Sequence, residues 1–192
     1  MTNTGRPRDV EKDAVILKAT RDILLEVGYD GLSIAAIAQR AGVGRPTIYR
    51  RWPSIEQLIE NAIEYDAHFT FEATGDLRAD VHALVAEYLD FFARPTMRAA
   101  LPSFIAGGHI GWKSQLRVGS HDSYARSAMR QCLAQARPEL SLAQLEKRAD
   151  AVIDLMIVST TARGVITGLK GRDRYCSDLA DTLVALALSQ EI

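Results

Sequence analysis

Apolar residues recur at three- and four-residue steps along most of the chain, which is the period of an α-helix with one buried face. From Glu11 to Val27 the apolar face contains Ile16, Ile23 and Leu24, and Gly28 follows as a left-handed helix terminator. No stretch alternates with the two-residue period of a strand, and no repeat of fixed length is present. The pattern therefore predicts an all-α protein of about nine helices.

Capping serines and helix-breaking glycines and prolines set the limits of the other expected helices. Ser33, Ser54 and Ser141 each stand where a hydroxyl can accept a free amide of a first turn, and Ser54 and Gln57 have the spacing of a capping box. In the stretch 108–137, Gly119 should kink or split the pattern, so one broken helix and two short ones are both open. After 11–27, the expected helices span 34–41, 46–50, 54–74, 76–93, 97–106, 141–166 and 174–189.

The two short helices on either side of Ala41 to Gly44 predict a helix-turn-helix, in which Gly42 permits the tight reversal. The second helix of such a unit enters the major groove of DNA. Arg45 at its start can make the paired contact that guanine offers, and the three residues Tyr49, Arg50 and Arg51 suit phosphate oxygens. The alternative is a small helical hairpin whose arginines are incidental surface charge.

The distribution of charge agrees with a DNA-binding first quarter. Although the whole chain carries a net charge of −1, residues 1–53 contain nine basic and six acidic side chains, which gives this part a net charge of +3. Arg6 and Arg8 precede the first helix, and a flexible arginine arm can lie in the negative potential of a minor groove. Such an arm could also be an ordinary tail. It indicates DNA binding only in combination with the helix-turn-helix next to it.

One segment is specific enough to indicate a family. The run from Gly28 to Ile34, then Ile37-Ala38, Ala41 to Gly44, Thr47 to Tyr49 and Trp52 to Ser54, closely resembles the DNA-binding head of TetR-type bacterial transcriptional regulators. The resemblance covers about Asp13 to Ala62. It implies an all-α homodimer with an N-terminal helix-turn-helix and a larger domain that binds an effector and dimerises.

Carried over by position, the resemblance implies that Ser33 holds a phosphate and that Gly44, Arg45, Thr47 and Tyr49 lie on the recognition helix. Ile55 stands where the family commonly has a basic residue, so this chain lacks the basic side chain for that contact. The expected domains are 1–53 for DNA binding with its basic arm, 54–74 as a connecting helix, and 75–192 for effector binding and dimerisation. The expected function is a repressor that binds a near-palindromic, double-stranded operator.

The effector region carries no sequence motif. The interior of a helical bundle can hold an apolar cavity, which favours a small, largely apolar or aromatic effector. Each candidate lining residue can equally be ordinary core, because large apolar side chains are usually buried. The candidates are Phe91, Phe92, Phe104, His109, Trp112, Tyr124, Met129, Met156 and Thr160.

The last two expected helices are apolar on more than one face, which predicts that they pair with a second copy. A fully internal helix would show the same pattern. The candidate dimerisation residues are Val152, Leu155, Leu179, Leu183 and Leu186.

Other classes of function find little support in the chain. No phosphate-binding loop, dinucleotide fingerprint, metalloprotease motif or nucleophile elbow occurs, so we expect neither an enzyme nor a cofactor or metal site. No signal segment or membrane span is evident, which favours the cytoplasm, and Cys132 and Cys176 are expected to be buried thiols. The remaining alternative is a ligand- or partner-binding helical protein whose helix-turn-helix no longer reads specific DNA.

Overall fold

The computed structural model describes residues 10–65, 71–106 and 120–189, and every regular element in these ranges is an α-helix. Nine helices, labelled α1 to α6 and α8 to α10, lie in the described residues and confirm the all-α prediction. The chain divides into two compact units, Met1–Ala67 and His68–Ile192. Each unit has its own buried core.

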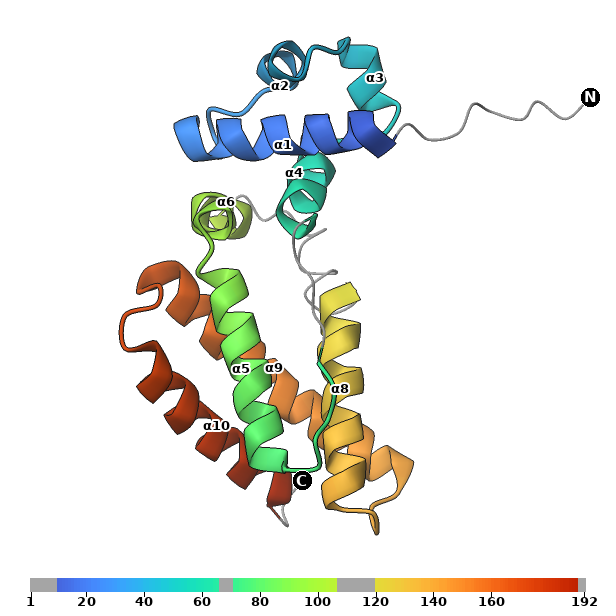
Figure 1. Cartoon of the computed structure of the whole chain (residues 1–192), viewed down its shortest axis with the longest axis vertical. Coiled ribbons are helices and arrows are strands. Elements are labelled where there is room, and N and C mark those ends of the chain that lie inside the picture. The colour runs from blue at the N-terminus through green and yellow to red at the C-terminus, as the bar shows by residue number, and fades with distance from the viewer. Residues whose placement is uncertain (1–9, 66–70, 107–119, 190–192) are drawn as a thin grey trace, which may run out of the picture. The chain divides into compact units, whose positions relative to one another are not determined.

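The first unit contains α1 (Val10–Val27), α2 (Ile34–Ala41), α3 (Arg45–Tyr49) and α4 (Ile55–Glu64). Helix α1 packs against both α2 and α4, and α2 packs against α3 (Figure 1). Burying the apolar stripes of these short helices against one another stabilises the unit, because none of the three shorter helices is long enough to be stable alone. Its fully buried side chains include Ile16, Leu24, Ile37, Ile48, Leu58 and Ile59.

The predicted caps are present at the starts of α2, α4 and α9. Ser33 Oγ accepts a hydrogen bond from the Ala36 amide at 3.2 Å, and Ser54 Oγ accepts one from the Gln57 amide at 3.2 Å. Ser141 forms a complete capping box with Gln144. These bonds satisfy amides that have no partner within a first helical turn.

Helix α4 is shorter than the sequence pattern predicts, since it ends at Glu64 instead of continuing to Thr74. The described residues 71–76 are not helical because their backbone donors bond elsewhere. The Thr74 amide donates to both carboxylate oxygens of Asp80 at 3.0 and 3.1 Å, and the Phe71 amide donates to the Tyr124 hydroxyl. The segment is thus fastened to the helices of the second unit.

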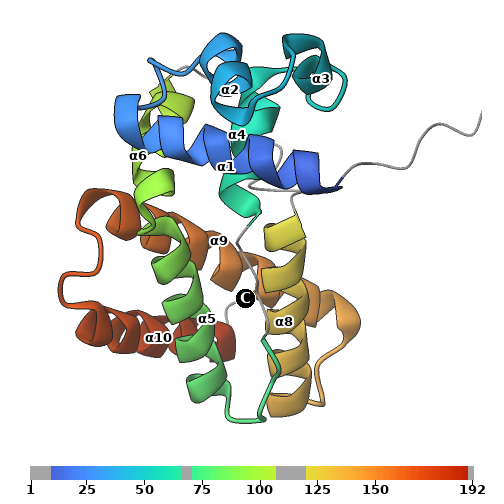
Figure 2. The ribbon, with the colours of Figure 1, turned by 45° about the horizontal axis from the view of Figure 1, so that its top comes forward.

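The second unit contains α5 (Leu77–Phe92), α6 (Pro95–Ala106), α8 (Ser120–Ala136), α9 (Leu142–Ile166) and α10 (Arg172–Leu188). Helix α5 lies between α8 and α10, and the long α9 packs against all three (Figure 2). Helices α5 and α9 approach closely at Gly164, where an added Cβ would lie 2.7 Å from the Phe92 carbonyl carbon. The core side chains include Leu84, Tyr88, Leu89, Met129, Leu133, Val152, Ile153 and Leu183.

Two further boundaries differ slightly from the prediction. Helix α6 begins at Pro95, where the missing amide of a first-turn proline costs nothing, and α10 begins at Arg172 after Gly171 with a φ of +65°. In the stretch left open at 108–137, α8 begins at Ser120, while residues 107–119 lie outside the described residues. Cys132 and Cys176 are buried free thiols, as predicted. Within the described ranges, no helix is both long and apolar enough to span a bilayer.

Candidate nucleic-acid interface

The reversal between α2 and α3 depends on Gly42, which caps α2 with φ +65° and ψ 31°. In this left-handed conformation the Val43 amide reaches back to the Ala38 carbonyl at 3.0 Å, and the Gly42 amide reaches the Gln39 carbonyl at 3.3 Å. A side chain at Gly42 would be strained by the backbone conformation alone. The predicted tight turn of a helix-turn-helix is therefore present.

Helix α3 has one buried anchor and one exposed polar face. Ile48 is completely buried, whereas Arg45, Tyr49 and Arg50 are exposed and Thr47 is half-buried. Arg45 and Tyr49 are four residues apart and therefore lie on the same side of the helix. This face presents the guanidinium of Arg45 beside the phenol of Tyr49, and the exposed guanidinium of Arg50 follows directly after the helix. Groups of these kinds can contact the base edges and phosphates of DNA.

Ser33 and Gly44 mark the starts of the two helices. Ser33 is exposed while its hydroxyl caps α2, so the side chain that would meet a phosphate is already oriented by the Ala36 amide. Gly44 caps α3 with φ −73° and ψ 143°, an extended conformation that other residues also adopt. Neither the backbone conformation nor the space around an added Cβ therefore requires glycine at this position.

Arg51, predicted from its position to suit phosphate oxygens, does not lie on the exposed face of Arg45, Tyr49 and Arg50. Its guanidinium Nε donates to the Asp13 carboxylate, and its side chain is only 11% exposed. Next to it, the buried Trp52 donates from its indole Nε1 to Asn61 Oδ1 at 2.9 Å. This ion pair separates Arg51 from the exposed side chains of Arg45, Tyr49 and Arg50, and its phosphate contact stays a prediction.

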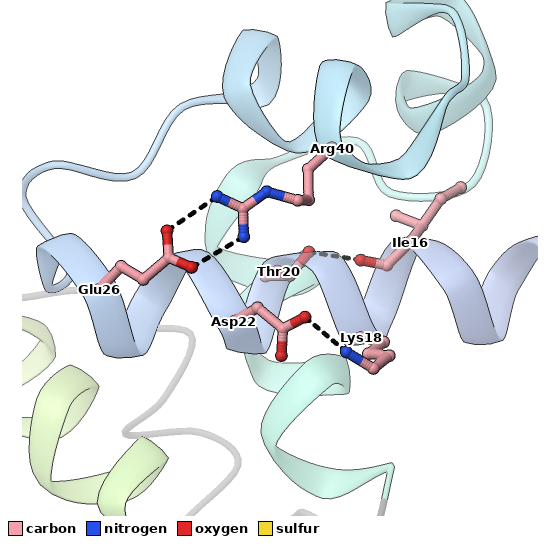
Figure 3. Close-up of polar contacts among 6 residues, drawn as sticks. All are labelled: Ile16, Lys18, Thr20, Asp22, Glu26 and Arg40. Carbon is pink, nitrogen blue, oxygen red and sulfur yellow. Dashed lines mark hydrogen bonds and ion pairs between the residues drawn. The ribbon is translucent and has the colours of Figure 1, made fainter.

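A second ion pair fastens α2 to α1 and was not anticipated from the sequence. Arg40 donates from its two terminal nitrogens to the two carboxylate oxygens of Glu26, at 2.9 and 2.8 Å (Figure 3). The hydrogen bonds from Arg40 lower the pKa of Glu26, although both groups are solvent-exposed. On α1 itself, Lys18 pairs with Asp22 at 2.6 Å, and the buried Thr20 hydroxyl donates to the Ile16 carbonyl at 2.9 Å (Figure 3). Both contacts within α1 join residues four positions apart and so follow from helical spacing, whereas the 14-residue separation of Glu26 and Arg40 carries no such signal.

Several expected site residues fall outside what the structure describes. Arg6 and Arg8 of the basic arm and His109 and Trp112 of the effector set lie outside the described residues, and Phe104 lies in α6 without a described side chain.

The other effector candidates are mostly core residues of the second unit. Tyr124 is half-buried and accepts the Phe71 amide, which places it at the segment before α5. A recess of about 320 Å³ in this unit is lined by a different set: Phe71, Glu72, Thr74, Ala79, Asp80, Ala83 and Glu87. The fully or nearly buried candidates are Phe91, Phe92, Met129, Met156 and Thr160.

The dimerisation candidates separate into two groups. Val152 and Leu183 are completely buried within the chain, so their side chains offer no surface to a partner. Leu155 is 41% exposed, and Leu179 and Leu186 are half-buried. Two more exposed apolar residues, Val158 at 67% and Ile166 at 78%, lie on the same side of α9 as Leu155.

No group of three or more histidine, cysteine or carboxylate side chains that could hold a metal ion occurs within the ranges 10–65, 71–106 and 120–189. The exposed groups around α2 and α3 are arginine, tyrosine and serine side chains and backbone amides, which are the kinds of group that contact phosphates and base edges in DNA complexes.

The comparisons with known proteins agree with this geometry. The family model of bacterial regulatory proteins of the tetR family matches residues 16–62, from within α1 to within α4. A DNA-binding transcriptional repressor TetR of Mycobacteroides abscessus is 28% identical over 170 residues, covering 83% of this chain and 82% of that protein.

Solved structures agree at the level of the fold. NalD of Pseudomonas aeruginosa, the secondary repressor of the MexAB-OprM multidrug efflux pump, aligns with a TM-score of 0.64 and 17% identity over 95% of this chain and 99% of its own. A TetR variant of Acinetobacter baumannii in complex with minocycline aligns with a TM-score of 0.60 and 16% identity over 92% and 98%. Residues 16–62 thus match the DNA-binding domain of the tetR family of bacterial regulatory proteins, and most of the chain is similar to a transcriptional repressor and to the fold of TetR-type regulators.

Proposed function

We propose that this regulator is a repressor that binds a near-palindromic operator as a homodimer and leaves it when a small, largely apolar effector binds. The observation that carries the proposal is the exposed face of Arg45, Tyr49 and Arg50 at an otherwise buried and capped helix-turn-helix. Incidental surface arginines would not require α3 to be anchored by the buried Ile48. The relative from Mycobacteroides abscessus is itself a transcriptional repressor, which supports repression over activation.

Regulation requires only that the effector prefer the conformation that does not bind DNA. A preference of about 5 kcal/mol moves a two-state equilibrium from almost wholly bound to almost wholly released. Minocycline in the related Acinetobacter structure is a small polycyclic ligand of that protein, and it supports a small-molecule effector here without identifying it. The candidate lining is the apolar interior of the second unit, including Phe91, Met129 and Met156.

The DNA-binding part of the proposal is tested by selecting binding sites from random duplex DNA with the purified protein. We expect an enriched near-palindrome whose half-site centres are about 34 Å apart, the length of one helical turn. Arg45→Ala and Tyr49→Ala should each weaken binding to that site by about tenfold, because one good base contact contributes roughly 1–3 kcal/mol. Lys147→Ala removes an exposed cation from α9 and is the matched control, expected to bind as the wild type.

The same experiment separates the proposal from a helical protein that binds only a ligand or a protein partner. If no sequence is enriched and all binding disappears at physiological salt, the helix-turn-helix binds polyanions without specificity and the proposal is wrong. For the effector, compounds are screened with the selected duplex for release of DNA and for a rise in melting temperature. A screen in which only highly charged compounds act contradicts an apolar effector.

A further inference from the structure

Arg51 links the two ends of the DNA-binding unit. Its Nε donates to the carboxylate of Asp13 in the first turns of α1, and its Nη1 lies 3.4 Å from the carbonyl oxygen of Thr47 in α3. The side chains of Arg51 and Asp13 are 11% and 20% exposed, so the pair is largely shielded from solvent. One guanidinium thereby connects α1 with the backbone of the recognition helix.

Helix α3 needs such a connection because it has little else to hold its direction. It is five residues long, and Ile48 is its one buried side chain. A helix this short gains almost no stability from its own hydrogen bonds. One buried side chain fixes the position of a helix but leaves it free to rotate about that point.

The surroundings of the pair are incompletely packed. A recess of about 430 Å³ lies beside it, and Asp13, Leu17, Arg51, Trp52 and Asn61 are among its lining residues. Apolar side chains therefore do not fill the space on this side of the pair. The ion pair of Asp13 with Arg51 joins α1 to the segment just after α3, and the hydrogen bond from Trp52 to Asn61 joins the same segment to α4.

We propose that Asp13 and Arg51 form a positioning pair that sets the angle of the recognition helix for base reading, and that Arg51 makes no phosphate contact. The inference rests on the proposed operator binding. Its Nε and Nη1 are already directed toward Asp13 and Thr47, and the side chain is only 11% exposed, so little of the guanidinium faces the solvent side where a phosphate would lie. Arg50, which is exposed and adjacent in sequence, supplies the phosphate contact instead.

The test compares the operator chosen by site selection with a scrambled duplex of the same length, over a series of salt concentrations. Arg51→Gln and Asp13→Asn should each weaken operator binding by about tenfold while changing scrambled-duplex binding by less than about twofold, as expected for a pair coupled by roughly 1.4 kcal/mol. The slope of log affinity against log salt should be unchanged in Arg51→Gln. In the control Arg50→Gln the slope should fall in magnitude by about 0.9, the value of one phosphate contact.

The double variant Asp13→Asn/Arg51→Gln tests whether the two residues act together. Its operator affinity should equal that of the worse single variant, because the second substitution removes a contact already lost. Arg51→Lys keeps the positive charge but loses the planar fork that spans Asp13 and Thr47, so it should also lose operator selectivity. Circular dichroism and urea unfolding at the assay temperature show which variants are folded, and operator affinities are compared only among those.

Two outcomes overturn the inference while leaving the proposed function intact. If Asp13→Asn tightens operator binding and Arg51→Gln lowers the salt slope by about 0.9, Arg51 contacts phosphate after all. If all pair variants bind the operator as the wild type does, the pair only stabilises the fold. A wild-type protein that selects no operator refutes both the inference and the proposed function.

Discussion

Gly42 and Gly44 lie two residues apart in one turn, yet their backbones place opposite demands on the side chain. Gly42 has φ +65° with open space around an added Cβ, whereas Gly44 has φ −73° and would place a Cβ 3.6 Å from Pro46 Cδ, an ordinary contact. Only Gly42 therefore needs glycine for conformational reasons. The two positions form a matched pair for testing backbone strain within the same loop.

Gly42→Ala should lower the free energy of unfolding by about 1–2 kcal/mol, the cost of the left-handed conformation for a residue with a Cβ. Gly44→Ala should leave it unchanged or raise it by up to about 1 kcal/mol, since alanine restricts the unfolded chain and fits the native angles. Urea unfolding of the two variants measures both values. Equal losses in both variants would contradict the assigned conformations.

The two thiols are shielded by burial rather than by pairing. Burial raises the pKa of Cys132 to about 12, with the neighbouring Asp80 adding to the effect, and burial also raises the pKa of Cys176. Because the thiolate is the reactive form, both side chains should be inert in the folded protein at pH 8. Titration with a thiol reagent should detect almost no reaction in native buffer and both thiols in denaturing urea. Rapid labelling of either residue without denaturant would show that the second unit opens.

At the scale of elements, the sequence predicted helices well wherever a local signal ends them. Ser33, Gly42 and Ser141 act within one turn of their own helix, so their spacing alone located the ends of α2 and the start of α9. Helix α4 was predicted ten residues too long, to Thr74 instead of Glu64, because the bonds that hold residues 71–75 come from Asp80 and Tyr124. Contacts between distant residues leave no periodic trace.

The same limit applied to the DNA-binding site. Arg45 was predicted to contact a base, and Tyr49 and Arg50 to contact phosphates, from the position of one short helix after a glycine turn; the structure exposes all three side chains. Arg51 looked equivalent to Arg50 in sequence, and its difference comes from Asp13, which is 38 residues away. Burial of a charged side chain is decided by such a partner and not by the residue itself.

Two carboxylates in the first unit should respond to pH with opposite sign. Hydrogen bonds from Arg40 lower the pKa of Glu26, so its ionised form stabilises the folded state above its ordinary value of 4.5, and the contribution is lost as the pH falls through the lowered pKa. Burial, and secondarily Glu60, raise the pKa of Glu64, so ionising Glu64 costs stability as the pH rises through its raised pKa.

At pH 7 Glu26→Gln should therefore lower the melting temperature slightly, while Glu64→Gln should raise it. Both differences in melting temperature from the wild type should approach zero in acid, once the wild-type carboxylate is itself protonated. The difference for Glu64→Gln should vanish by about pH 4, and the difference for Glu26→Gln only at lower pH. Thermal unfolding of both variants between pH 3 and pH 7, a range spanning the ordinary carboxylate values, provides the measurement. Added salt should weaken the effect of Glu26→Gln, because this pair is exposed. A shift of the same sign for both variants would contradict the contacts described.

At the scale of the whole molecule, operator binding depends on how many copies of the head are joined. One head can reach only one half-site, and a two-fold dimer presents two recognition helices to a near-palindrome. The second unit offers an apolar surface for such pairing: Leu155, Val158, Ala162 and Ile166 share one side of α9 and are all exposed. The fully buried Val152 and Leu183 support this surface from beneath by holding α9 and α10 to the core.

Val158→Glu and Ile166→Glu should each convert a dimer to a monomer at low micromolar concentration, because a carboxylate buried against a partner helix has no compensating charge. Operator affinity should fall by on the order of 10²- to 10⁴-fold as the second head is lost, while binding of one half-site duplex stays unchanged. Leu142→Glu is the matched control, since Leu142 is 69% exposed on the opposite side of the same helix. Sedimentation equilibrium gives the mass, and titration of full-site and half-site duplexes gives the affinities. Variants that remain dimeric would exclude this face of α9 as the interface. A wild-type protein that is monomeric and still binds the full palindrome tightly would show that operator binding does not depend on dimerisation.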